Sequence, residues 1–432
     1  PHPISKTTAP ASGGSIALTD TNALTAALTT GGNAILTAGG NLAVSGSSNN
    51  LITNAAATSF GTTTVGGSLS TTAAGAISQT GALSVTGTSS LAAGANAITL
   101  SNSSNDFTGA VGLSNSGANN VSIRDTNGLI LGNVNVGTGT LGVQAVGITQ
   151  AAGTAIVQSA AAGAANFNSG GGVLTLANTG NDFTGAVNLT GGATQITDAN
   201  ALTLGTLATG ALTATSTGAL NLGSGTVTGN LAATSNNGAI GQTGALAVTG
   251  SSTINAGSGT IMLTDVGNNF AGTVNLTGGT TQITDANALT LGTLGTGALT
   301  AVSHGALSLG SGTVTANLIA TSNNGVIGQA GALHVTGSST INAGSAAIAL
   351  TNANNDFGSA VTATGTGVQI TDANNLAIAG LANGANGVVS LIAGGILTLP
   401  AGAINTGTAN LTLVSNGGSL TTPGALSGAN VF

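Results

Sequence analysis

Charged and aromatic side chains are scarce in this sequence of 432 residues. Two residues are basic and nine are acidic, which gives a net charge of −7, and neither tryptophan nor tyrosine occurs. Binding of nucleic acid requires lysines and arginines clustered on one face, so the sequence excludes that class of function. No apolar run is long enough to cross a membrane as a helix, so we expect no insertion into a membrane. The apolar content of 41% is too high for a disordered chain of such low charge.

Cysteine is also absent, so disulfides do not stabilise the fold. A cysteine-free chain fits an exported bacterial-type protein, although a cytosolic protein without cysteine fits as well. The chain begins PHPISKTTAP, without Met or an apolar leader, and we expect that a signal peptide has been removed. Residues 1–13 hold three of the five prolines and the only lysine. We expect them to form an extended N-terminal tail.

An internal repeat of 87 residues dominates the rest of the chain. It runs from Gly210 to Thr296 and returns almost unchanged from Gly297. It divides into four pieces, of which the third is the longest, and each opens on glycine: Gly210–Thr228, Gly229–Thr249, Gly250–Thr277 and Gly278–Thr296. Short apolar/polar alternation is typical of strands, and self-similarity with a period of about 20 residues is typical of a solenoid.

The repeat therefore predicts an all-β fold, a parallel β-helix solenoid of about 20 coils with three strands per coil. We expect it to be right-handed, because parallel crossover connections almost always are. Length sets no limit on such a core, since each coil contacts only its neighbours. We thus expect a single continuous β-helix over residues 14–432.

The two copies of the repeat test which side chains point inward. Leu212 and Leu246 lie on the inner face of their strands if side chains alternate with a period of two. Both return as leucine in the next copy, whereas the outward Ala247 becomes His334. Constancy inside and variation outside is what a packed core requires. We expect the opening glycines to supply corners with positive φ.

Two short markers recur with the same period, Asn-Asp-Phe or its variants and Asp-x-Asn. The phenylalanines are Phe107, Phe183, Phe270 and Phe357, and the aspartates are Asp125, Asp198, Asp285 and Asp372. We expect the segment that ends at Phe270 to stand off the coils, with the ring plugging the edge of one long coil formed by the third piece of the repeat.

Catalytic groups do not recur in the way that a working site would require. His304 and His334 replace Thr217 and Ala247 of the previous copy, so we interpret both histidines as surface residues. Asp182 and Asp198 fall on adjacent coils, but the first becomes Asn269 in the next copy. Glycoside hydrolysis needs a fixed pair of acids. We therefore expect the protein not to be an enzyme.

Calcium is the remaining candidate ligand. Asp198, Asp285 and Asp372 each begin an Asp-x-Asn sequence that resembles part of a calcium loop. Calcium requires six to eight oxygen ligands, usually from several carboxylates. An aspartate that caps its own corner explains the pattern with one residue. We favour the corner cap, expect no cofactor, and keep calcium as the alternative.

The coil sequences resemble the repeat regions of filamentous-haemagglutinin-like exoproteins of the two-partner secretion type, and of related autotransporter passengers. The phrases that carry the resemblance are GALTATSTGALNLGSGTVTGNLAATS, TINAGSGTIMLT and NLTLVSNGGSLTT, and it covers nearly all of Ser15–Leu420. Such proteins are right-handed β-helices that Gram-negative bacteria export for adhesion and biofilm formation. The resemblance implies an extracellular or cell-surface location, and it carries over no functional residues.

The hypothesis from the sequence is therefore an extracellular structural protein, a fibre subunit that serves adhesion or a biofilm matrix. Because open solenoid ends expose unpaired backbone, we expect copies to join head to tail into a homopolymer, with the N-terminal tail of one copy adding to the exposed end of the next. The candidate subunit contacts are Pro1, His2, Pro3, Ile4 and Phe432. The alternative is a monomeric stalk segment of a larger adhesin that binds a cell-surface partner.

Overall fold

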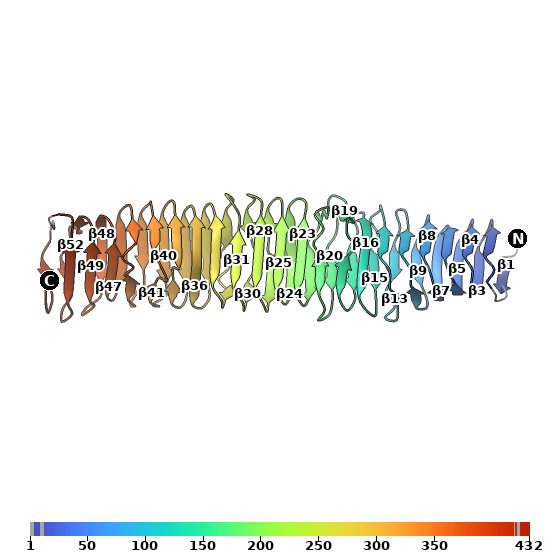
Figure 1. Ribbon diagram of the computed structural model, residues 1–432, viewed down its shortest axis with the longest axis horizontal. Coiled ribbons are helices and arrows are strands. Elements are labelled where there is room, and N and C mark those ends of the chain that lie inside the picture. The colour runs from blue at the N-terminus through green and yellow to red at the C-terminus, as the bar shows by residue number, and fades with distance from the viewer. Residues whose placement is uncertain (1–3, 9–12, 419, 421–423) are drawn as a thin grey trace. The chain divides into compact units, whose positions relative to one another are not determined.

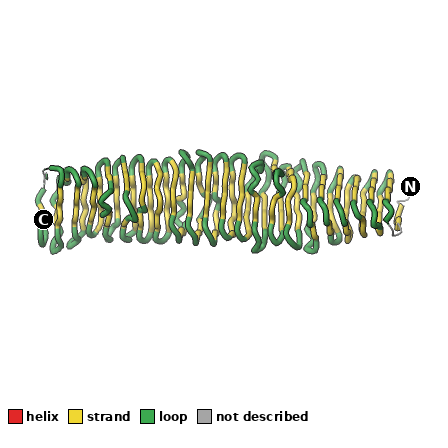
Figure 2. Tube along the Cα trace, viewed as in Figure 1, coloured by secondary structure: helices red, strands yellow, loops and turns green. Residues whose placement is uncertain are grey.

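The computed structural model describes residues 4–8, 13–418, 420 and 424–432. None of these residues is helical, and Figure 2 draws them only as strands and loops. Parallel strands stack into a β-solenoid of about 20 turns, which confirms the predicted fold class. The chain divides into two compact units, Pro1–Thr217 and Gly218–Phe432, and each is a stack of parallel strands (Figure 1).

In the first unit the strands form rows in which each strand pairs with its counterpart one turn later. One row comprises β2 (Ile16–Asp20), β4 (Ala34–Ala38), β6 (Leu51–Ala55), β8 (Leu69–Ala73), β11 (Ser89–Ala92), β14 (Val111–Ser114), β16 (Leu129–Val136) and β19 (Ile156–Gln158). The next comprises β1 (Ile4–Thr8), β3 (Leu24–Thr29), β5 (Asn41–Ser48), β7 (Ala57–Val65), β9 (Ile77–Gln79), β12 (Ile98–Leu100), β15 (Val121–Arg124), β17 (Leu141–Gln144), β20 (Ala165–Asn168), β22 (Val187–Gly191) and β24 (Leu202–Thr209). Two shorter rows remain. In one, β10 (Leu83–Val85) pairs with β7, and β13 (Asp106–Phe107) pairs with β10. In the other, β18 (Ile148–Gln150) pairs with β16, and β21 (Leu174–Leu176), β23 (Thr194–Asp198) and β25 (Leu212–Ser216) each pair with the strand before them in the row.

The second unit repeats this arrangement. One row comprises β28 (Leu231–Ser235), β31 (Ser252–Asn255), β34 (Val274–Gly278), β36 (Leu289–Thr296), β39 (Ser311–Val314), β42 (Leu333–Val335) and β45 (Asp356–Phe357). The next comprises β26 (Leu220–Asn221), β29 (Ile240–Gly241), β32 (Ile261–Leu263), β35 (Thr281–Asp285), β37 (Leu299–Ser303), β40 (Leu318–Ser322), β43 (Ser339–Asn342), β46 (Val361–Gly365) and β48 (Leu376–Asn383). A third row comprises β27 (Ser224–Val227), β30 (Leu246–Val248) and β33 (Asn269–Phe270). A fourth row begins with β38 (Leu307–Ser308), which pairs with β36, and continues through β41 (Ile327–Gly328), β44 (Ile348–Leu350), β47 (Val368–Asp372), β49 (Val389–Ala393) and β52 (Leu411–Ser415). The last strands are β50 (Leu397–Thr398), which pairs with β48, and β51 (Ile404–Asn405), which pairs with β53 (Leu426–Ser427).

One turn of the second unit shows how three strands make a coil. The chain runs through β40, β41 and β42, and β43 then pairs in parallel with β40. Leu318 lies opposite Ser339, so one turn is complete when the chain reaches Ser339. Every backbone group of a central strand can thus pair with the turn before and the turn after it. The prediction of three strands per coil is confirmed here.

The predicted long coil, which was the third piece of the repeat, is wrong. Ser252 lies opposite Val274, and Thr281 lies opposite Leu299, so the first of these turns closes before the predicted coil ends. Glycine had marked the start of each piece, but the pairing register sets the real turn length. The segment before Phe270 does carry an exposed tip, because Val266 is 71% exposed, whereas Phe270 itself is 1% exposed.

Apolar side chains from the inner faces fill the core, as the alternation predicts. Leu212 and Leu246 are 1% and 0% exposed, and Leu299 and Leu333 in the next copy are each 0% exposed. Of the seven phenylalanines only Phe432 is exposed; the other six are at most 2% exposed. The burial of branched aliphatic and aromatic side chains is the main favourable term in the stability of such a stack.

The opening glycines are needed for a different reason from the one that the sequence indicated. Gly210, Gly250 and Gly278 do not adopt positive φ. A Cβ atom at Gly250 would lie 2.4 Å from Oδ1 of Asn230 and 2.6 Å from the carbonyl carbon of Gly229 in the turn before. Close stacking of one corner on the next therefore excludes a side chain at this position.

The predicted tail lies partly outside the described residues. Residues 1–3 and 9–12, which include the candidates Pro1, His2 and Pro3, are not among them. Ile4–Thr8 form β1, which pairs in parallel with β3, so this part of the tail extends the row of strands in its own chain. No helix in the described residues is long and apolar enough to cross a membrane.

Candidate functional site

The recurring aspartates each hold two backbone N–H groups on different turns. Oδ1 of Asp285 accepts the N–H of Asn287 at 2.7 Å, which closes the predicted corner cap. Oδ2 of Asp285 accepts the N–H of Phe270 at 2.7 Å, 15 residues earlier on the preceding turn. The same two bonds are made by Asp125 (Asn127, Phe107), Asp198 (Asn200, Phe183) and Asp372 (Asn374, Phe357). The corner cap is thus also a link between turns.

Burial perturbs these carboxyl groups. The loss of solvent raises the pKa of Asp285 above its usual value, against the hydrogen bonds from Phe270 and Asn287 and the nearby His304, which lower it. The pKa of Asp125, Asp198 and Asp372 is likewise raised by burial, and the two backbone hydrogen bonds of each oppose that shift. Each carboxylate is thus held by the dipoles of two backbone N–H groups, and Asp285 also feels the charge of His304.

The geometry favours the corner cap over calcium. Both oxygens of Asp198, Asp285 and Asp372 already accept a backbone hydrogen bond. Nowhere in the described part of the chain do three or more His, Cys, Asp or Glu side chains gather as a metal site would require. Calcium needs six to eight oxygen ligands, which these isolated carboxylates do not offer.

A pair of amides, a buried asparagine and a half-buried glutamine, accompanies each aspartate, and the sequence did not reveal it. Asn268 is 0% exposed, and its Nδ2 donates to Oε1 of Gln242 at 2.9 Å while its Oδ1 accepts Nε2 of Gln242 at 2.7 Å. Asn268 Nδ2 also donates to the carbonyl of Leu263, and its Oδ1 accepts the N–H of Leu246 at 2.9 Å. The chain repeats this Gln–Asn pair as Gln79–Asn105, Gln150–Asn181 and Gln329–Asn355.

One signal in the sequence could have located these pairs. The asparagine stands two residues before each recurring phenylalanine, and a glutamine precedes it by 26 residues in three of the copies. Polarity alone does not distinguish a buried amide from an exposed one. Only the register of the turns, which places the two side chains together, identifies the pair.

Each histidine lies near one aspartate, and the two histidines belong to different rows of strands. His304 is exposed at the end of β37, and His334 is exposed on β42, in a different row of strands. His334 lies opposite Asp356. Asp182 lies near enough to Asp198 for its charge to raise the pKa of that carboxyl slightly further, as the sequence suggested for adjacent coils.

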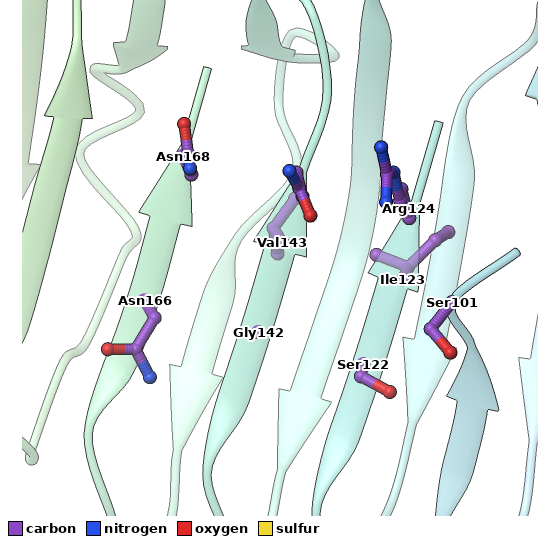
Figure 3. Close-up of a pocket in the computed structure, with 9 residues that line it drawn as sticks. Ser101, Ser122, Ile123, Arg124, Gly142, Val143, Asn166 and Asn168 are labelled. Carbon is purple, nitrogen blue, oxygen red and sulfur yellow. The ribbon is translucent and has the colours of Figure 1, made fainter. Parts of the chain in front are cut away.

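A solvent-facing hollow in the first unit is the best candidate for a ligand site. It lies on the outer side of β15, β17 and β20 and has a volume of about 380 Å³. Figure 3 shows its lining on three neighbouring strands: Ser122, Ile123 and Arg124, then Gly142 and Val143, then Asn166 and Asn168, with Ser101 beside them. Gln144, which follows Val143 on β17, also lines the hollow. No motif in the sequence marks this site, so it was not predicted.

Two of the subunit-contact candidates, Ile4 and Phe432, are among the described residues. Ile4 belongs to β1, as noted above. Phe432 is 69% exposed, and its backbone is fixed by hydrogen bonds to Leu411 and Leu413. Its neighbour Val431 is 50% exposed.

Together, the stacked turns and the recurring side-chain links define a repeat protein of the β-solenoid class. A family model described as "Repeats of unknown function (DUF5649)" matches residues 47–114, 118–190, 209–277 and 296–364. These matches cover more than half of the chain, which therefore belongs to this family. Each match contains one Gln–Asn pair. No curated protein and no solved structure matches the chain.

Proposed function

We propose that this protein is an extracellular structural module, a β-solenoid that serves as the shaft of a fibre or of a surface exoprotein in adhesion or matrix formation. The proposal rests on the hydrogen bonds that the recurring polar side chains make. The aspartates and amides that recur with the repeat bond to the backbone of neighbouring turns instead of converging on a reaction centre.

The outer surface supports the same role. Outward positions of the strands are occupied mainly by Thr, Ser, Asn and Ala, and 3% of all residues are charged. A surface with so little charge places few electrostatic constraints on partners. It suits a molecule that spaces and presents other groups rather than one that transforms a substrate.

The resemblance to filamentous-haemagglutinin-like and autotransporter-passenger repeats supports export by a bacterial secretion system. The family match itself names no function, so the secretion route and the adhesive role belong to this proposal. A direct test is to express the gene in its own host and follow the chain by protease shaving of intact cells. Accessibility at the surface is expected, and retention in the cytosol would overturn the proposal.

Self-association is the second part of the proposal. The apolar Val431 and Phe432 are 50% and 69% exposed and offer a contact for another copy. Negative-stain images of the purified chain should show fibres that shorten when both residues are replaced by serine. Val266→Ser is the matched control, because Val266 is 71% exposed at a turn in the second unit.

The alternative is a monomeric stalk segment of a larger adhesin that binds a cell-surface partner through its sides. Images that show only single particles at all concentrations would favour this alternative. Binding of the monomer to cells would then be the activity to measure.

A further inference from the structure

We propose that the hollow on β15, β17 and β20, called here the Arg124 hollow, binds a saccharide that carries a carboxylate, such as a uronic acid unit. Its lining was given above, and its volume of about 380 Å³ leaves room for one or two sugar rings. The proposal goes beyond the structural role, and each can fail without the other.

The hollow carries a positive charge, that of Arg124. The sequence has one arginine, and it lies in this hollow with its side chain half-buried. Within the described residues, no hydrogen bond or ion pair engages the guanidinium of Arg124, although its backbone carbonyl accepts Nδ2 of Asn105. A guanidinium presents a planar set of donors that matches a carboxylate with two parallel hydrogen bonds.

The carboxylate of the adjacent Asp125 is already engaged by backbone N–H groups. Asp125 follows Arg124, but it is 3% exposed and its two oxygens are held by the N–H groups of Phe107 and Asn127. Asp106 acts on Asp125, whose pKa is raised mainly by burial. The guanidinium thus remains the outward-facing charge of the hollow.

A row of amide side chains lies beside the arginine. Gln144 lies directly opposite Arg124, and Asn168 lies directly opposite Gln144 on the next strand. All three side chains are outside the core, on strands about 4.8 Å apart. Their spacing is comparable to the length of a sugar ring. An amide both donates and accepts hydrogen bonds, so it can pair with a sugar hydroxyl that acts as acceptor or as donor.

A second outward-facing row, two residues earlier on each of the same strands, contains a gap. Ser122, Gly142 and Asn166 lie opposite one another on the same three strands. The Cβ that Gly142 lacks would meet nothing closer than Ser122 Cβ and Val121 O, both at 3.9 Å. The backbone of β17 therefore forms an open floor between two polar walls, and a ligand can approach it closely.

The chemistry of the lining also limits the kind of sugar that the hollow can bind. None of its lining residues is aromatic, so a neutral sugar would lack the ring-stacking surface that apolar pockets provide. Affinity must then come from the guanidinium, and the amides and hydroxyls confer orientation. A carboxylate-bearing saccharide meets both needs.

The test is calorimetric titration of the whole chain with tetragalacturonate, and with a neutral glucose tetramer and a sulfated dextran oligomer as comparisons. We expect binding of tetragalacturonate that is stronger than that of the other two ligands. Arg124→Gln should weaken it by about tenfold or more, and Arg124→Lys should weaken it less, because the charge remains while the paired donors are lost.

Filling the gap supplies an independent variant. Gly142→Val should abolish binding by occupying the floor, whereas Gly241→Val should not, since Gly241 is an outward glycine with similar space on β29 of the second unit. The circular dichroism of each variant reports whether the strands are retained. Equal binding of the neutral tetramer, preference for the sulfated oligomer, no binding at millimolar ligand, or full binding by Arg124→Gln would each overturn the proposal.

Discussion

Single polar side chains in this protein join the backbone of one corner to the backbone of the preceding turn. Asp285 bonds forward to Asn287 within its own corner and backward to Phe270 on the turn before. Phe270 belongs to a strand of only two residues, and its N–H donates to this carboxylate. The carboxylate therefore stabilises both the corner and the short strand beneath it.

Replacement of one aspartate tests this link. Asp285→Asn keeps one acceptor but turns an NH₂ group toward one of the two N–H donors, so it should cost about 1–3 kcal/mol locally. Hydrogen exchange of the segment around Phe270 should accelerate accordingly. Asp265→Asn is the matched control, because the corresponding position of the next copy is Asn352 and both side chains accept an N–H two residues on. Equal exchange in the two variants would contradict the role given to Asp285.

The same aspartates determine an unusual dependence on pH. Burial raises the pKa of Asp125, Asp198, Asp285 and Asp372 in the folded chain above the value of about 3.9 in an unfolded chain. Between the two values the folded state holds more protons, so the free energy of unfolding falls as pH rises. The contribution is complete below about pH 3.9 and is lost as pH rises through the raised pKa.

The expected result is a higher midpoint of thermal unfolding at about pH 4 than at about pH 7. Replacing all four aspartates by asparagine should flatten this difference, although it lowers the midpoint at every pH. A midpoint that increases from acid to neutral pH would show that the backbone hydrogen bonds outweigh burial.

At the scale of the element, the Gln–Asn pair joins two turns at the edge of the core, through a buried asparagine and a half-buried glutamine. Asn268 makes its hydrogen bonds to Gln242, Leu246 and Leu263 while it is 0% exposed. Removal of such a group leaves buried donors and acceptors without partners, and each of these costs about 1–3 kcal/mol. A satisfied buried network of this kind specifies one register of the turns over others.

A double-mutant cycle measures that coupling. Asn268→Ala should destabilise the chain strongly, Gln242→Ala should do so less, and the double variant should cost less than the sum of the two. Asn236→Ala is the control, since this asparagine is exposed at a corner. Midpoints of chemical denaturation report the three values. Simple additivity would mean that the two amides do not act as a unit.

The elements also show what could be predicted from the sequence. Alternation identified the inward Leu212 and Leu246 correctly, because the period of two is a local property of a strand. It did not find Asn268 beside Gln242, since that contact depends on the register between turns. The predicted length of the turn that closes at Val274 was wrong for the same reason. Glycine marks close stacking of corners there, and not the start of a turn. The Arg124 hollow has no periodic signal at all.

At the scale of the whole chain, the repeat predicts that full periods are interchangeable. Deletion of Leu231–Asn317 removes 87 residues from the second unit and joins Asn230 to a leucine in the equivalent position, Leu318. Because each turn contacts only its neighbours, the shortened chain should fold with an unchanged β spectrum and one cooperative transition. Deletion of Leu231–Ile327 removes a further half turn and should abolish folding. Similar behaviour of the two deletions would contradict a fixed register.

The measurement that tests the stacked-turn account most directly is disulfide trapping, for which the absence of cysteine makes the chain well suited. Thr340 and Thr362 are exposed and lie directly opposite each other on β43 and β46, within the distance that a disulfide spans. Thr340→Cys with Thr362→Cys should oxidise rapidly and almost completely in the folded chain. The pair Thr340→Cys with Ala363→Cys should not, because Ala363 is 0% exposed and points into the core. Rapid oxidation of the second pair, or none of the first, would contradict the parallel register on which the account depends.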